Sequence, residues 1–450
     1  MWNFRRAVTS AALALLLVSI ARADDWPQWL GPQRDGVWRE IGILEKFPEG
    51  GPKIRWRVPV GAGYSSPSVS RGRVYLTDRV VKTGAPKPPS PFARISTPGV
   101  ERVLCLDEAT GKTVWSQEYP CDYTMSYNAG PRAAPIIEGG HVYTLGAEGD
   151  LQCRESDSGK LVWQQHLGGE NGARTPMWGF AASPLVEGDK LITLGPGPEG
   201  VAVAFNKQTG APVWTALPAK EPGYCAPIVI EAGGKRQLIV FHPEGLNSLD
   251  PETGKVYWSE KFNAKFGMTI ATPRRSGDLL FLTTFYNGSL MMRLDKDKPA
   301  ATVLWKISGK NEQHTASLHG VLCTPAFDGE NIYGVCSYGQ LRGLESQTGK
   351  RLWETFAATS ADAGEVRWAN AFITPNANRY FLFNEKGDLI IANLTPKGYE
   401  ETSRAHLLEP TNPDAGRLTV WSQPAYADRC IFARNDKELL CADLAAPVGK

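Results

Sequence analysis

The sequence predicts an all-β fold, namely an eight-bladed β-propeller of four-stranded blades that is closed by its N-terminal strand. Three observations predict it: a strand–turn–strand motif that recurs along the chain, eight proline-ended openings, and an unpaired strand near the N-terminus. Gly and Pro are also plentiful, with 46 and 33 residues, as expected for many short strands joined by turns.

The recurring motif is clearest in residues 249–258, where a strand ends in an acid, a Thr-Gly turn follows, and a second strand carries a Trp. Gly254 suits a turn position that requires a positive φ, and Asp250 can hydrogen-bond the backbone of its own turn. The tryptophans that mark this structural repeat are Trp56, Trp115, Trp163, Trp214, Trp258, Trp305 and Trp353.

The openings fix the number of repeats. Each ends in a proline, at Pro67, Pro135, Pro184, Pro227, Pro273, Pro325, Pro375 and Pro424. Most units run about 43–52 residues and hold four expected strands, the size of a propeller blade. The last repeat contains only three expected strands, while residues 53–58 form an orphan Trp strand. We expect that strand to complete the last blade and remove two exposed edges.

Three repeats depart from the pattern. The first carries a Pro-rich insertion at 80–101, expected to be a long surface loop that overhangs one face. The fifth replaces Thr-Gly with residues 295–300 but keeps Trp305. The seventh lacks the Trp, and Leu407 and Leu408 are candidates for its place.

The predicted organisation is a signal peptide at 1–23, a Trp-rich N-terminal arm at 24–52, the propeller at 53–444, and a tail at 445–450. Arg5 and Arg6 precede a short apolar run, and residues 21–23 have the small-x-small form of a cleavage site. No Cys follows that site, so a lipid anchor is not expected. We therefore expect a periplasmic or secreted protein, without membrane insertion.

The arm contains Trp26, Trp29 and Trp38, which are costly to leave in water. We expect the arm to pack across the surface of the propeller, although a Trp-rich strip could also be a partner site.

The charge of the mature chain is nearly balanced. Removal of residues 1–23 takes three arginines away, and 49 − 3 = 46 basic residues then face 47 acidic ones. This balance excludes a general attraction to nucleic acid or to anionic lipid.

Eight cysteines in an exported chain permit disulfides. Expected hairpin registers place Cys323 opposite Cys336 and Cys430 opposite Cys441, within reach of a disulfide. The alternative is that these residues are small buried thiols.

The repeat motif resembles that of pyrroloquinoline-quinone-like propellers, the quinoprotein alcohol dehydrogenase-like superfamily. That superfamily also includes the propeller lipoprotein of the outer-membrane β-barrel assembly machinery. The resemblance covers about residues 53–444 and implies a Trp between neighbouring blades. The opening residues 25–36 also look like the start of exported bacterial proteins of this kind.

Enzymes of this superfamily hold the quinone against two adjacent, disulfide-linked cysteines and bind calcium with acidic and amide side chains. This chain has no Cys-Cys dipeptide, so no catalytic residue can be carried over. We therefore expect no catalytic residues and no cofactor, with pyrroloquinoline quinone and calcium as the alternative. The six histidines lack metal-like spacing, which predicts no metal site.

Any ligand site should lie at one mouth of the central channel, where the loops entering the inner strands converge. Positions three residues before the prolines, with nearby loops, give the channel-mouth candidates Tyr64, Arg132, Trp178, Tyr224, His319, Trp368, Asn370, Trp421 and Gln423. The same register also contains Ala181, Ile270, Leu322 and Phe372. Such a set could hold a planar anion, a sugar or a peptide, or could simply pack between blades.

The predicted function is that of an exported, non-enzymatic binding scaffold at the bacterial cell envelope, with an unknown protein, peptide or glycan at the channel mouth. The first alternative is a quinone-dependent dehydrogenase. The second is an outer-membrane protein assembly factor.

Overall fold

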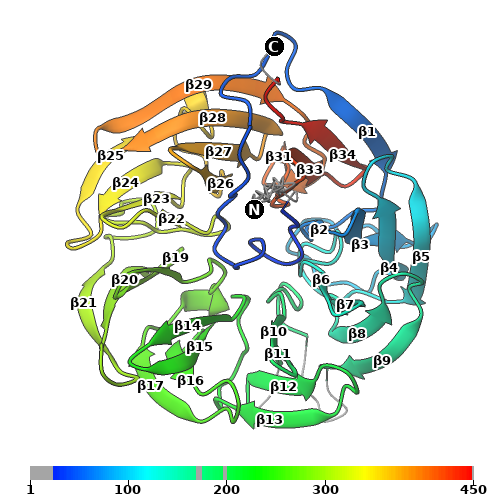
Figure 1. The fold of residues 1–450 in the computed structure, drawn as a ribbon, viewed down its shortest axis with the longest axis horizontal. Helices are drawn as coiled ribbons and strands as arrows, with labels where there is room; N and C mark the ends of the chain where they lie inside the picture. The colour runs from blue at the N-terminus through cyan, green and yellow to red at the C-terminus, as the bar shows by residue number, and fades with distance from the viewer. Residues whose placement is uncertain (1–23, 169–174, 196–199, 448–450) are drawn as a thin grey trace, which may run out of the picture.

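The computed structural model describes residues 24–168, 175–195 and 200–447. The expected signal peptide at 1–23 lies outside the described residues. Within these ranges, eight four-stranded antiparallel sheets are arranged as blades around a central axis (Figure 1). The prediction of an all-β, eight-bladed propeller is confirmed.

Each blade runs outward from a short inner strand to a long outer strand. Blades 1 to 4 are β2 (Ser68–Ser70), β3 (Arg73–Val81), β4 (Gly99–Asp107) and β5 (Thr113–Pro120); β6 (Ile136–Glu138), β7 (His141–Leu145), β8 (Asp150–Glu155) and β9 (Leu161–His166); β10 (Leu185–Glu187), β11 (Lys190–Leu194), β12 (Ala202–Asn206) and β13 (Pro212–Ala216); and β14 (Ile228–Ala232), β15 (Lys235–His242), β16 (Gly245–Leu249) and β17 (Val256–Lys261). Blades 5 to 8 are β18 (Arg274–Ser276), β19 (Leu279–Thr284), β20 (Gly288–Leu294) and β21 (Ala301–Ile307); β22 (Ala326–Phe327), β23 (Asn331–Val335), β24 (Leu341–Glu345) and β25 (Arg351–Thr355); β26 (Ala371–Asn376), β27 (Arg379–Asn384), β28 (Asp388–Thr395) and β29 (Gly398–His406); and β32 (Ala425–Ala427), β33 (Cys430–Arg434), β34 (Glu438–Asp443) and β1 (Ile54–Pro59).

Three smaller elements complete the fold. A hairpin of β30 (Asn412–Asp414) and β31 (Arg417–Thr419) lies between blades 7 and 8 in the sequence and was not predicted. Two 3-10 turns, η1 (Lys265–Gly267) and η2 (Ala361–Ala363), are three residues each. No helix in the described part of the chain has the length and apolarity needed to cross a membrane.

The ring closes as the sequence predicts. Strand β1 pairs with β34 as the outer strand of blade 8, with Trp56 opposite Cys441. At the open end of this pair, the Asp443 amide donates to the Lys53 carbonyl at 2.8 Å. Blade 8 is therefore built from both ends of the chain.

The repeat tryptophans fasten neighbouring blades together. Each lies on an outer strand, opposite the residue at which the strand pairing shifts. Six of the seven indole N–H groups donate to a backbone carbonyl in the outer turn of the next blade, at 2.7–3.2 Å. These pairs are Trp56 with Glu108, Trp115 with Ser156, Trp163 with Lys207, Trp214 with Pro251, Trp305 with Ser346, and Trp353 with Thr395.

The glycine of the Thr-Gly turn receives the Trp ring of the preceding blade. Gly210 has φ +73°, and a Cβ added there would lie 2.7 Å from Cδ2 of Trp163. Gly159 and Trp115 show the same approach, at 2.6 Å. A positive φ alone favours glycine, and the ring contact then excludes any side chain. The turn and the Trp are thus two halves of one inter-blade contact.

The two irregular repeats show what happens when one half is missing. The blade that follows Trp258 has no Thr-Gly turn, and the Trp258 indole N–H donates instead to Gln237 Oε1 of its own blade at 2.9 Å. In blade 7 the Trp position is occupied by Ser403, opposite Ile391. The expectation that Leu407 and Leu408 take this place is wrong, because they lie beyond the end of β29.

Blade 7 has a physical reason to lack the Trp. The next blade joins β34 to β1 by pairing the chain ends, so it offers no covalent Thr-Gly turn to receive a ring. The arm fills this seam instead: the Phe47 amide donates to Ser403 Oγ at 3.0 Å, and the Phe47 side chain is buried in the adjoining core.

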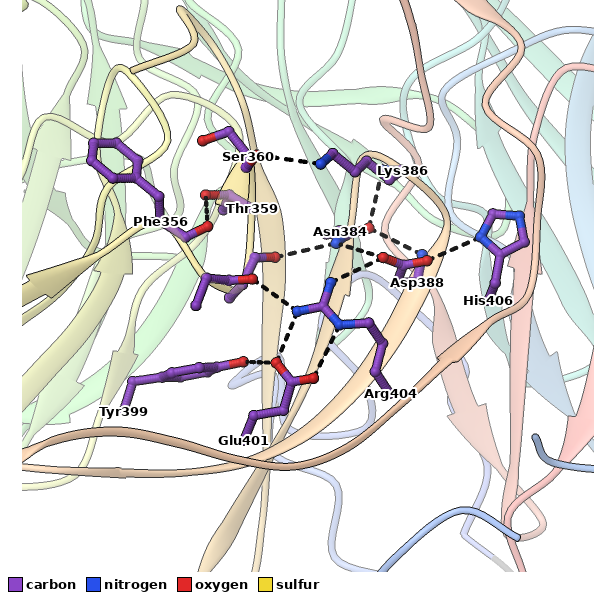
Figure 2. Close-up of polar contacts among 12 residues, drawn as sticks. Phe356, Thr359, Ser360, Asn384, Lys386, Asp388, Tyr399, Glu401, Arg404 and His406 are labelled. Carbon is purple, nitrogen blue, oxygen red and sulfur yellow. Dashed lines mark hydrogen bonds and ion pairs between the residues drawn. The ribbon is translucent and has the colours of Figure 1, made fainter. Parts of the chain in front are cut away.

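An ion-pair network on blade 7 adds another link to blade 6. Figure 2 shows Arg404 between the carboxylates of Asp388 and Glu401. The Arg404 guanidinium also donates to the Ala357 carbonyl of blade 6 at 2.8 Å, and His406 lies 2.9 Å from Asp388. These ionisable side chains serve blade packing and lie apart from the central channel.

The arm packs across the propeller, as predicted, and it also crosses one end of the channel, which was not predicted (Figure 1). Trp26 pairs with the inner strand of blade 1, and the Trp38 amide donates to the Pro375 carbonyl of blade 7, both at 2.9 Å. Arg34 is buried and donates to the carbonyls of Pro184 and Pro227 at 2.9 and 3.0 Å. Because burial disfavours the charged guanidinium, the pKa of Arg34 falls to about 9.

The expected disulfides do not occur in the structure, where all eight cysteines are buried free thiols. Cys430 lies opposite Asp443 rather than Cys441, because Arg434 pairs with Leu439 across a longer turn. Strand β22 begins only at residue 326, so Cys323 lies outside the paired segment. Cys336 instead contacts a guanidinium nitrogen of Arg342 through its sulfur at 3.0 Å.

Candidate functional site

The channel holds a cavity of about 470 Å³ at its centre, which we call the central cup. Trp29 of the arm lies at its base and is fixed by an indole hydrogen bond to Thr272 Oγ1 at 3.0 Å. All eight residues that stand three positions before the opening prolines line it, namely Tyr64, Arg132, Ala181, Tyr224, Ile270, Leu322, Phe372 and Trp421. The loops that enter the inner strands therefore converge on one site.

Aromatic rings dominate the walls of the cup. On one side Tyr127 lies between Phe92 and Trp421, with ring centroids 5.3 and 5.9 Å apart. On another, Trp178 packs edge-on against Tyr224 at 5.3 Å. Surfaces of this kind bind planar or apolar groups through stacking and edge contacts.

The rim of the cup exposes large apolar side chains. Phe92, Met177 and Phe266 line the cavity and are 50%, 44% and 56% exposed. Phe92 belongs to the first-blade insertion. Residues 80–81 and 99–101, expected to lie in a loop, extend β3 and β4 instead, and the loop between them brings Phe92 to 5.9 Å from Trp368 at the mouth. Phe266 lies on η1 with φ +58°, a left-handed conformation that is unusual for a bulky residue.

Two arginines line the cup. Arg367 lies over the Trp368 ring at 4.6 Å and 3.4 Å from Glu312. Arg132 is half-buried, 5.1 Å from the centroid of the Tyr64 ring. Its guanidinium donates to the backbone carbonyls of Gly130, Ser126 and Tyr127.

A polar network behind the wall orients the rings. The Tyr127 hydroxyl donates to Asp414 at 2.8 Å, and Arg417 binds the other oxygen of Asp414 at 2.7 Å. Arg417 also binds Glu385, which accepts the Trp421 indole N–H at 3.0 Å. Burial raises the pKa of Asp414 above its ordinary value. The unpredicted hairpin β30–β31 supplies both Asp414 and Arg417 to this network.

The structure brings most of the channel-mouth candidates together. Tyr64, Arg132, Trp178, Tyr224, Trp368, Trp421 and Gln423 line the cup, whereas the buried residues His319 and Asn370 do not. Gln423 Oε1 finds no hydrogen-bond partner among the described residues.

His319 has a structural role instead. Its Nε2 accepts the Gly309 amide at 3.1 Å, so the ring proton is on Nδ1, which donates to the Phe285 carbonyl at 2.9 Å. Burial lowers the pKa of His319 to about 4, so the imidazole is neutral near pH 7.

Sequence reasoning missed several lining residues, among them Trp29, Phe92, Tyr127, Met177, Phe266, Tyr286 and Arg367. They come from the arm, the insertion, the loops between blades and, for Tyr286, the turn between β19 and β20, all of which are outside the repeat register. The apolar residues in the otherwise polar insertion were the one available signal for Phe92. Within the described ranges, no cluster of three or more His, Cys, Asp or Glu side chains could hold a metal.

Comparison with known proteins places the fold and the repeat in one family. A family model described as outer membrane protein assembly factor BamB matches residues 99–224 and 198–445. This chain belongs to the BamB family. BamB of Shewanella oneidensis is 23% identical over 327 residues, covering 67% of this chain and 70% of that protein. BamB of Aliivibrio fischeri is 34% identical over 84 residues, covering 18% and 21%.

Solved structures show the same architecture. BamB from Moraxella catarrhalis superposes with a TM-score of 0.53 at 14% identity, covering 88% of this chain and all of that one. Quinohemoprotein alcohol dehydrogenase from Comamonas testosteroni superposes at 0.59 and 13%, covering 96% and 82%. At these identities the likeness shows the fold alone. The predicted resemblance to pyrroloquinoline-quinone-like propellers is confirmed, and among them the chain is a BamB-family member.

Proposed function

We propose that this chain is a binding scaffold for the assembly of outer-membrane proteins, which holds a polypeptide partner at the open mouth of the central cup. The BamB family match over residues 99–224 and 198–445 supports the assembly role. A partner in that process would meet the protein at the cell envelope, which agrees with the signal peptide expected at 1–23.

The observation that carries the proposal is the apolar rim. Phe92, Met177 and Phe266 come from three separate loops and expose large side chains around one aromatic cavity. Exposed apolar residues gathered at a concave site are typical of surfaces that a partner covers. A polypeptide fits this lining better than a glycan, because the surface that faces the cavity is mostly apolar and offers little to replace the water around sugar hydroxyls.

Site-specific photo-crosslinking tests the proposal. A photoreactive phenylalanine analogue at Phe92 or Phe266 should crosslink in cells to an outer-membrane assembly component or to an outer-membrane protein in assembly. The same analogue at Val213, which is 48% exposed on the outer strand β13, should not. Equal crosslinking from Val213 and from the rim would contradict a partner at the mouth, as would crosslinks only to proteins unrelated to assembly.

The alternative of a quinone-dependent dehydrogenase finds less support in the cup. The described lining residues include neither Asp nor Glu to bind calcium, and no Cys to form a platform for the quinone. These residues do not fit the calcium–quinone pair. A titration with pyrroloquinoline quinone and calcium, followed by melting temperature and dye reduction, checks this point. Calcium-dependent stabilisation together with turnover would support the dehydrogenase alternative.

A further inference from the structure

We propose that the central cup recognises an aromatic residue that has a carboxylate beside it, with the ring between the aromatic walls and the carboxylate on Arg132. This inference rests on the proposed function and names the chemistry that the polypeptide partner presents. The shared chemistry has two sources, the chain terminus of the partner or an adjacent Asp or Glu side chain.

Among the residues that the structure describes, no carboxylate balances the charge of Arg132. The hydrogen bonds of its guanidinium go to backbone carbonyls, those of Gly130, Ser126 and Tyr127. Of the two arginines that line the cup, Arg367 is paired with Glu312, whereas Arg132 has no carboxylate within ion-pair distance among the described residues. Carbonyl dipoles satisfy N–H groups but leave the net charge in place.

The surroundings of Arg132 make an anionic ligand favourable. The guanidinium is half-buried against the Tyr64 ring at 5.1 Å, in a cavity whose walls are mostly apolar. An ion pair gains strength where water is displaced, and guanidinium matches a carboxylate with two parallel hydrogen bonds. Arg417, on the far side of the same wall, shows the contrast, because Asp414 and Glu385 already neutralise it.

The space beside Arg132 suits an aromatic ring. Tyr127, whose carbonyl accepts from Arg132, packs against Trp421 at 5.9 Å, and Trp178 packs against Tyr224 at 5.3 Å. Edge and offset contacts between rings are favourable at such separations. The volume of about 470 Å³ lies in the range of cavities that hold one small ligand.

The arm decides how a polypeptide can enter. Trp29 forms the base of the cup, and Arg34 ties the arm to blades 3 and 4 behind it. With the arm fixed across the channel, we expect a chain to present an end or a projecting side chain at the mouth. A carboxylate next to an aromatic ring then meets Arg132 from the mouth.

Titration calorimetry with a matched pair of probes tests the charge. N-acetyl-L-phenylalanine and N-acetyl-L-phenylalanine amide share the ring and differ in the carboxylate. We expect the acid to bind roughly tenfold tighter, the worth of one charge-assisted contact. Arg132→Gln should abolish that preference, and Arg132→Lys should keep part of it. Arg293→Gln, which removes the same charge from an exposed ion pair on β20, should leave the preference unchanged.

Two further measurements separate the possible outcomes. Trp178→Ala should weaken the binding of the acid and of the amide by the same factor, because it removes an aromatic side chain from the cavity wall and changes no charge. A comparison of the affinities of N-acetyl-Phe-Asp-amide and N-acetyl-Phe-Asn-amide then shows whether a side-chain carboxylate binds as well as the carboxylate of a chain terminus. Equal binding of acid and amide to the wild-type protein, or no binding of either, overturns the inference. Crosslinking from Phe92 and Phe266 reports the polypeptide partner separately, so the failure of one proposal is distinguishable from the failure of the other.

Discussion

A glycine substitution measures the inter-blade contact directly. Gly210 has φ +73° and is buried under Trp163 of the preceding blade, whereas Gly72 has φ +74° and is exposed, with no described atom within 4 Å of an added Cβ. The two positions therefore have the same backbone conformation and differ in the ring contact. Gly210→Ala and Gly72→Ala form a matched pair.

The expected magnitudes follow from three contributions. Alanine in the left-handed region costs about 1–2 kcal/mol at either site. The reduced freedom of the unfolded chain returns about 0.4–1 kcal/mol. Only at Gly210 does the new methyl meet the Trp163 ring, at 2.7 Å from Cδ2, which adds about 1–3 kcal/mol of overpacking. We expect a loss of about 1 kcal/mol for Gly72→Ala and about 2–4 kcal/mol for Gly210→Ala.

Urea unfolding, followed by far-UV circular dichroism and tryptophan fluorescence, provides the assay. The difference between the two variants in free energy of unfolding isolates the contact between turn and ring. A change in the slope with urea would indicate that unfolding is no longer two-state or that the compactness of the unfolded chain has changed. Equal losses in both variants would refute the reasoning, because backbone conformation alone would then explain the glycine.

Two more predictions concern single side chains. Trp163→Phe should cost more stability than Trp258→Phe, by about 1 kcal/mol, because only the first leaves a carbonyl of the next blade, that of Lys207, without its donor; urea midpoints check the order. The second concerns pH. Because the folded-state pKa of His319 is about 4 and its unfolded value is about 6.5, the unfolded chain binds more protons in this window. Stability should therefore fall as pH drops from about 6.5 to about 4, with up to roughly 3 kcal/mol from this residue. His319→Asn should show a flatter profile than wild type in urea titrations at pH 7 and pH 4.5, and identical slopes would count against the assignment.

The repeat could be predicted from the sequence because each half of the inter-blade contact is local. The turn glycine and the Trp of the following strand can both be recognised within ten residues of sequence, as in 249–258. The inward-facing register carried the same regularity, which is why the eight positions before the prolines line one cup. His319 was misplaced because its loop turns it into the protein, toward the Phe285 carbonyl.

The rest of the site depends on segments that are not part of the sequence repeat. Trp29 reaches the base of the cup because the arm crosses the channel, and Phe92 reaches the rim because an insertion folds back over it. The position of Ser403 in blade 7 follows from the absence of a covalent turn in blade 8, a fact of ring closure that no local pattern contains. The pairing of Cys430 with Cys441 failed for a related reason, since one longer turn shifts a whole hairpin. The register predicted around 329–330 is the one observed, but β22 is too short to include Cys323.

Closing the ring with β1 sets the order in which the protein can mature. Residues 54–59 are synthesised early, yet their partner β34 ends at residue 443, so the hydrogen-bonding edge of β1 stays open until almost the whole chain exists. The packing of Trp38 is delayed as well, because its ring contacts Tyr426 of the last blade. Long-range pairings of this kind are slow to form, and they leave edges open to wrong partners meanwhile. The arm and β1 are thus synthesised early but reach their final packing last, and the base of the cup forms only when the ring is complete.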